Sequence, residues 1–154
     1  MNLLVLFAVL TAAGFATVAS AVGGRGFGDR YKWFTVEEGL QQAAATDKPA
    51  MVVIHKSWCG ACKRLGPLFA ESSELLKLSE EFVMINVHDD EEPAAPQYKP
   101  YGGYVPRILF FEPNGDVRDD IINRDGNPQY KYFYTSAENV VSGMKNALGL
   151  LKPK

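Results

Sequence analysis

Two cysteines three residues apart, Cys59 and Cys62, are the side chains best suited to chemistry, and the sequence contains no others. A small secreted protein that relies on disulfides for stability carries several of them, spread along the chain. A disulfide across so short a separation removes little conformational entropy from the unfolded chain. The spacing therefore favours a dithiol–disulfide couple that exchanges with other disulfides over a structural crosslink.

The segment around the cysteines predicts that they begin a helix. Residues 50–55 (AMVVIH) form an apolar, β-branched run typical of a strand buried on both faces, and a helical pattern then runs to about residue 78. The unpaired N–H groups of a first helical turn stabilise a thiolate and lower its pKa below about 8.5. We expect Cys59 at the N-cap, more exposed, to attack a client disulfide, and the more buried Cys62 to resolve the mixed disulfide.

Two prolines accompany the cysteine pair. Pro67 lies five residues after Cys62, inside the predicted helix, where it removes a backbone hydrogen bond and kinks the helix. Pro106 precedes a predicted strand at 107–112, a position that tolerates proline. A cis Val105–Pro106 bond would bring a backbone carbonyl beside the sulfurs, although only about 5–6 % of such bonds in folded proteins are cis.

Apolar side chains next to the cysteines predict a contact surface for a client peptide. Trp58 would form a flat rim beside Cys59, and Tyr104 is as well explained by this surface as by core packing. Lys56 and Lys63 are either solvated charges or stabilise the Cys59 thiolate. The candidate substrate-binding residues are Trp58, Gly60, Ala61, Tyr104, Val105 and Pro106.

A zinc site is the main alternative use of the cysteines. Structural zinc usually takes four protein ligands, and the chain could add only His55 and His88, at a spacing that fits no familiar zinc motif. The acidic residues 89–92 lack the alternating ligands and glycine of an EF-hand and indicate a solvated loop. We expect no bound metal or cofactor.

The remaining pattern predicts one α/β domain. A capping box at 35–38 begins a helix to about residue 45, a second buried strand covers 81–87, and a last helix runs from 137 to about 151. A turn at 113–116 should join the strand at 107–112 to a hairpin partner at 117–122. Strand–helix–strand order implies a parallel pair, so we expect a central mixed β-sheet flanked by helices on both faces.

The N-terminal residues predict export. Residues 1–21 have the apolar run and small-residue end of a signal peptide, although no basic residue precedes the run. That run is shorter than the roughly 20 residues of a membrane span, so no membrane association is expected after cleavage. We expect a flexible Gly-rich lead-in at 22–30 and the domain at 31–152. A net charge of −2 without a basic run gives no sign of a nucleic-acid partner.

Several separated motifs carry a resemblance to known proteins. SWCGACK (57–63), with its following proline and the VP before a strand, resembles the thioredoxin superfamily. More closely, the chain resembles the family of thioredoxin domain-containing protein 12, an endoplasmic-reticulum protein, and the anterior gradient proteins. The matching motifs are GFGD (26–29), IHKSWCGACK (54–63), FAES (69–72), GGYVPRILF (102–110) and GNPQYKYFY (126–134).

The resemblance implies a thioredoxin-like fold, with Cys59 as nucleophile, Cys62 as resolving thiol and Pro106 as a cis-proline. It also implies reduction and oxidation of disulfides in client proteins, with glutathione as a candidate redox co-substrate. The chain ends without a KDEL-like signal, so we expect it in the endoplasmic-reticulum lumen or secreted. We expect a monomer.

Two residue choices depart from the family pattern. Val53 stands where thioredoxins hold a buried acid, so the Cys62 proton must use water or another group, with His55 and Glu71 as candidates. The Gly–Ala pair between the cysteines suggests a reduction potential between about −270 and −180 mV.

Two classes of function remain. One is a thiol–disulfide oxidoreductase of the glutathione-dependent protein-disulfide reductase type. The other is a non-catalytic secreted or luminal binding protein on a thioredoxin scaffold, as the anterior gradient relatives suggest. Those relatives often lack the second cysteine, and because this chain keeps Cys62 the enzyme is favoured.

Overall fold

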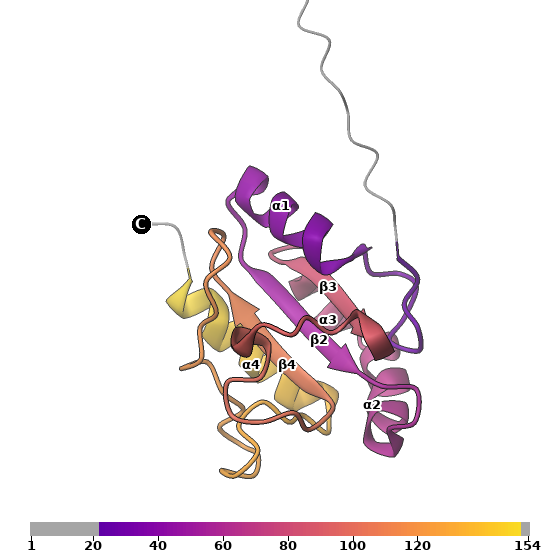
Figure 1. Cartoon of the computed structure of the whole chain (residues 1–154). Helices are drawn as coiled ribbons and strands as arrows, with labels where there is room; N and C mark the ends of the chain where they lie inside the picture. Colours follow the sequence, from indigo (N-terminus) through magenta and orange to yellow (C-terminus); the bar gives the residue numbers. More distant parts are fainter. Residues whose placement is uncertain (1–21, 152–154) are drawn as a thin grey trace, which may run out of the picture.

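A four-stranded mixed sheet forms the centre of the computed structural model, which describes residues 22–151 (Figure 1). The strand order is β1-β3-β2-β4, with β1 and β2 parallel to β3, and β4 antiparallel to β2. The strands are β1 (Trp33–Phe34), β2 (Ala50–His55), β3 (Val83–His88) and β4 (Arg107–Phe111). The helices are α1 (Val36–Thr46), α2 (Gly60–Glu71), α3 (Ser73–Ser79) and α4 (Ala137–Leu150), with short 3₁₀ turns η1 (Asp89–Glu91) and η2 (Pro96–Tyr98).

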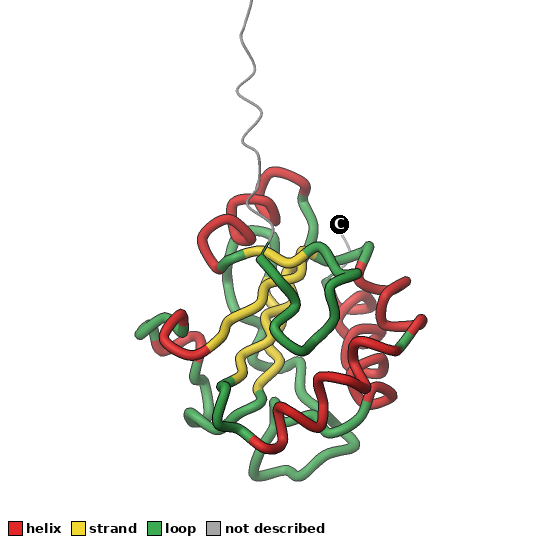
Figure 2. The backbone as a smooth tube through the Cα atoms, turned by 90° about the vertical axis from the view of Figure 1, so that its right-hand side faces the viewer, coloured by secondary structure: helices red, strands yellow, loops and turns green. Residues whose placement is uncertain are grey.

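Alternate residues of β2 fill two cores, one on each face of the sheet. Met51 and Val53 pack with residues of α2, α3 and α4, whereas Val52 and Ile54 pack with Ala43 of α1. Figure 2 shows the sheet between these helices. Because both faces are covered, β2 is apolar along nearly its whole length, and the predicted mixed sheet with helices on both faces is confirmed.

Three loops meet at one edge of the sheet. β2 and β3 are parallel and in register from Ala50↔Val83 to His55↔His88, so the loops that follow them leave the same edge. β4 is antiparallel to β2, with Arg107 opposite Ile54, so the loop that precedes β4 reaches that edge too. These loops contain the cysteine pair, the acidic run and Pro106 respectively.

Two predicted elements differ from the observed ones, and one observed strand has no predicted counterpart. The helix expected to run to residue 78 is interrupted at Ser72, whose extended backbone ends α2 and whose hydroxyl accepts from the Leu75 N–H to cap α3. The expected hairpin partner at 117–122 is reduced to a single bridge between Phe111 and Val117, because the chain turns again at Arg118–Ile121. The two-residue strand β1 was not predicted.

The expectation of a flexible lead-in at residues 22–30 is wrong. Phe27 is 1 % exposed, and its ring packs on those of Phe69 and His55. The segment passes so close to α2 that a Cβ on Gly66 would lie 2.5 Å from the carbonyl oxygen of Gly26. Its glycines therefore allow close packing of backbone on backbone, and the segment is part of the domain.

The predicted signal peptide at 1–21 lies outside the described residues, as does the residue 152 that ends the predicted domain. Between residues 22 and 151, no helix has the length and apolar character that crossing a bilayer requires.

Candidate active site

Cys59 and Cys62 form a disulfide at the start of α2. Cys59 is the N-cap residue, with an extended backbone, and its Sγ accepts the backbone N–H of Cys62 at 3.1 Å. The N-cap position and the two sulfurs on the first turn are as the sequence predicted. Because the Cys62 N–H of this first turn points toward Sγ of Cys59, it would stabilise a thiolate there.

The expected difference in exposure between the two cysteines is nearly absent. Cys59 is 5 % exposed and Cys62 is 3 % exposed. The reason is local: Sγ of Cys59 is bonded to Cys62 and lies 3.6 Å from the carbonyl oxygen of Val105, so the neighbouring loop covers it. In the disulfide form, access to the sulfurs is therefore narrow.

The Val105–Pro106 peptide bond is cis, as the resemblance implied. The carbonyl of Val105 faces the cysteine pair, and Pro106 itself is buried at the start of β4. This loop supplies a backbone acceptor next to Cys59.

The candidate rim residues differ in their surroundings. Trp58 is 74 % exposed, and Gly60 is also exposed, whereas Ala61 is half-buried. Tyr104 packs inward instead: its hydroxyl accepts the Tyr132 N–H at 3.0 Å, and burial raises the pKa of Tyr104. Of the aromatic candidates, Trp58 is therefore the one free to contact a partner.

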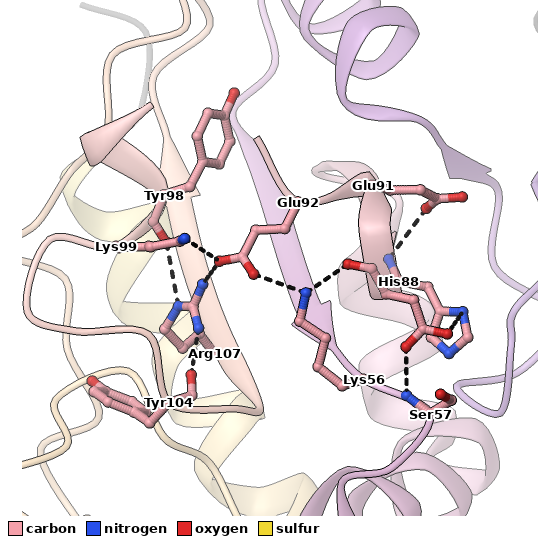
Figure 3. Close-up of polar contacts among 10 residues, drawn as sticks. Lys56, Ser57, His88, Glu91, Glu92, Tyr98, Lys99, Tyr104 and Arg107 are labelled. Carbon is pink, nitrogen blue, oxygen red and sulfur yellow. Dashed lines mark hydrogen bonds and ion pairs between the residues drawn. The ribbon is translucent and has the colours of Figure 1, made fainter. Parts of the chain in front are cut away.

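An ionic cluster of Glu92, Arg107, Lys56 and Lys99 connects the loops around the site, with Arg107 buried and Lys99 exposed (Figure 3). The Arg107 guanidinium is fully buried, pairs with Glu92 and donates to the carbonyl oxygens of Tyr98 and Tyr104. Glu92 also binds Lys56, whose Nζ lies 2.9 Å from the carboxylate. The cluster thus joins the strand end before the cysteines to the loop that holds Val105.

The acidic loop also holds the residues that precede Cys59. The Ser57 N–H donates to the Asp89 carboxylate at 2.7 Å, and this bond lowers the pKa of Asp89. Lys56 donates to the Asp89 carbonyl oxygen at 2.6 Å. Lys56 is therefore bound to Asp89 and Glu92, whereas Lys63 is exposed on α2.

Residues 89–92 were predicted to form a solvated loop, and the pairing of Glu92 with Arg107 was not predicted. One signal could have found it: Arg107 is a charged residue that opens an otherwise apolar strand. Such an arginine is rarely buried without an acidic partner.

His55 and Val53 occupy the sheet face behind Cys62. Val53 is fully buried in the α2-side core, and so no carboxylate stands at that position. His55 is also buried and lines a cavity of about 240 Å³ together with Cys62. Glu71, the other candidate for the Cys62 proton, is exposed at the far end of α2 and does not line this cavity.

Comparisons with known proteins agree with this geometry. The Thioredoxin-like family pattern matches residues 31–113. Anterior gradient protein 2-B of Xenopus laevis is 40 % identical over 129 residues, covering 83 % of this chain and 77 % of that protein. The human anterior gradient protein 2 homolog is 39 % identical over 129 residues, covering 83 % of this chain and 73 % of that protein.

Solved structures support the fold. The first thioredoxin domain of mouse protein disulfide-isomerase A4 has a TM-score of 0.58 at 15 % identity, covering 89 % of this chain and 87 % of that one. The DsbH oxidoreductase has a TM-score of 0.57 at 17 % identity, covering 91 % of this chain and 94 % of that one. The chain therefore belongs to the thioredoxin-like family that includes the anterior gradient proteins, and its Cys59–Cys62 pair makes it disulfide-oxidoreductase-like.

Proposed function

We propose that this protein catalyses thiol–disulfide exchange with disulfides of client proteins. The observation that carries the proposal is the placement of Cys59 Sγ at the N-cap of α2, where the Cys62 N–H donates to it. Such a hydrogen bond stabilises the thiolate form of the sulfur and lowers the pKa of the thiol. The thiolate is the species that attacks a disulfide.

The reaction has two balanced steps. The Cys59 thiolate attacks one sulfur of the client disulfide, forms a mixed disulfide, and releases the other client sulfur as a thiolate. Cys62 then loses its proton and attacks Cys59, forming the Cys59–Cys62 disulfide and releasing the second client thiol. The client gains two electrons, and the enzyme pair is oxidised by two. The reverse sequence donates a disulfide.

Client binding would use the surface beside Cys59. The exposed Trp58 ring offers an apolar contact, and the Val105 carbonyl offers a backbone acceptor 3.6 Å from the sulfur. Gly60 and Ala61 add little bulk there, so an extended peptide could approach the helix start. We propose that the protein acts as a monomer.

Glutathione is the proposed co-substrate, because a small thiol can reach a disulfide that is nearly covered. The proposed location is the endoplasmic-reticulum lumen or the secreted fraction, where a Cys59–Cys62 disulfide would persist.

Insulin reduction in a glutathione buffer tests the proposal. Cys59→Ala should abolish turnover, because the attacking sulfur is gone. Cys62→Ala should accumulate mixed disulfides with insulin, visible on non-reducing gels. Equal residual activity in both variants would contradict the assigned roles, and an inert wild-type protein would support the partner-binding alternative.

A further inference from the structure

A buried histidine, His55, lies behind the cysteine pair as the last residue of β2. It is 2 % exposed. Its ring packs on Phe27 and on His88, with ring centroids 4.5 and 4.7 Å apart. A buried imidazole can be simple packing or a proton-transfer group, and its hydrogen bonds decide which chemistry is open to it.

The hydrogen bonds of Asn86 fix the tautomer of His55. Nδ2 of Asn86 lies 3.0 Å from the Gly24 carbonyl oxygen, which can only accept, so this end of the amide must be the donor. The other end, Oδ1, lies 2.7 Å from Nε2 of His55. Since Oδ1 can only accept, Nε2 carries the hydrogen, and in the neutral ring Nδ1 is left with its lone pair. Within residues 22–151 no hydrogen bond to that nitrogen is found.

A cavity joins this imidazole to the resolving cysteine. His55 and Cys62 both line the space of about 240 Å³ between α2, the end of β2 and the 22–30 segment. The cavity has room for water, and one water molecule is enough to carry a proton between a donor and an acceptor that do not touch. Val53 contributes no acid here.

Burial is the main factor that favours the neutral form of His55, and charged groups act on it in both directions. The cations that line the cavity with His55 are Arg25 from the N-terminal segment, Lys56 after β2 and Lys63 on α2, and His88 adds a second imidazole. The acids on this side are Asp89 and Glu91, and Glu91 pairs with Arg25. Burial lowers the pKa of His55, Asn86 opposes the shift, and His88 and Arg25 add to it. The ring is therefore a base, not a cation, at neutral pH.

We propose that His55 accepts the proton of Cys62 when Cys62 resolves the mixed disulfide, an inference that rests on the proposed exchange function. The proton moves from Sγ of Cys62 to Nδ1 of His55, and the thiolate attacks Sγ of Cys59. The bond between Cys59 and the client sulfur breaks, and its electron pair leaves with that sulfur, which takes up a proton. No external oxidant or reductant enters this step.

Stopped-flow reaction of the reduced protein with 5,5′-dithiobis(2-nitrobenzoate) separates the two thiols. The first coloured thiolate released reports attack by Cys59, and the second reports attack by Cys62 on the mixed disulfide. In the wild-type protein the second rate should be nearly constant above pH 7 and fall at acid pH as His55 is protonated. In His55→Gln it should instead follow the ionisation of an unassisted thiol, about 30-fold slower at pH 7 than at its plateau above pH 8.5.

The same substitution at the other histidine, His88→Gln, is the matched control. Its second thiolate release should have the wild-type dependence on pH above pH 7. If the second thiolate release of His55→Gln depended on pH as in the wild-type protein, the role of His55 would be overturned, while the exchange function would stay intact. If the wild-type protein released no first thiolate, the exchange function itself would fail, and the role of His55 with it.

An NMR titration of the unmodified protein gives a test that needs no variant. The imidazole resonances of His55 report its pKa, and the acid midpoint of the second thiolate release should lie within about one pH unit of it. A larger difference would refute proton transfer to His55 even if His55→Gln does not fold.

Discussion

Removing the charge of Glu92 should destabilise the protein and loosen the loop beside Cys59. In Glu92→Gln the Arg107 guanidinium, which is fully buried, loses its only carboxylate partner among the described residues. Breaking a buried ion pair from one side costs about 3–5 kcal/mol, because the remaining charge is uncompensated. The glutamine oxygen can still accept a hydrogen bond, so we expect a loss near the lower end, about 3 kcal/mol.

Urea denaturation at several pH values tests both the magnitude and the cause. Burial tends to raise the pKa of Glu92, but the hydrogen bonds and charges of Lys56 and Arg107 outweigh it, so the net effect is a pKa lowered from 4.5. A group with a lowered folded-state pKa contributes stability above its unfolded pKa and loses it as pH falls through the folded value. The difference between wild type and Glu92→Gln should therefore be full at pH 7 and shrink below about pH 4.5.

A double variant separates the ion pair from simple loss of packing. Replacing Glu92 and Arg107 together with methionine removes both charges and should be less destabilising than the sum of the two single changes, because no unpaired charge is left. A pH-independent loss in Glu92→Gln, or strict additivity in the double variant, would refute the view that the cluster acts through charge.

Three further outcomes follow from the site and the core. Trp58→Ala should raise KM for insulin several-fold while changing the free energy of unfolding by less than about 0.5 kcal/mol, because the exposed ring packs on little of its own chain; an unchanged KM would remove Trp58 from the client surface. Phe27→Ala should lower the free energy of unfolding by about 3–5 kcal/mol in urea, and a loss below about 1 kcal/mol would mean that the 22–30 segment is not part of the core. In the reduced protein, thiolate absorbance should give Cys59 a pKa below about 8.5, because the Cys62 N–H in the first turn of α2 donates to its sulfur; a higher value would contradict thiolate activation at the N-cap.

Local patterns were sufficient to predict the elements that bear the cysteines. An unbroken apolar run gives β2 because both faces of that strand are buried, and the Thr35 capping pattern marks the start of α1. The break at Ser72 was missed because the helical pattern of apolar residues continues across it from α2 into α3. The N-terminal segment was misjudged because its glycines favour flexibility in isolation, whereas here they let Phe27 reach the core.

Part of the candidate site could likewise be predicted from local sequence, and part could not. The N-cap placement of Cys59 depends on a turn of helix a few residues long, which sequence reasoning can predict. The cluster around Glu92 depends on the pairing of Glu92 with Arg107, 15 residues further along the chain, and the His55–Asn86 pair spans 31 residues. Contacts of this kind depend on strand register, which no local pattern contains.

Strand register also explains why the reactive sulfurs, His55 and the acidic loop lie at one edge of the sheet. With β2 and β3 parallel, His55 lies opposite His88, and the residues that follow each strand emerge side by side. A shift of one residue would turn His55 to the α1 face and separate Lys56 from the acidic loop. The start of α2 positions the two sulfurs. The positions of His55 and of the ionic cluster around Glu92 both depend on the β2–β3 pairing. Mutations that weaken the β2–β3 pairing should therefore slow the Cys62 step more than the Cys59 step.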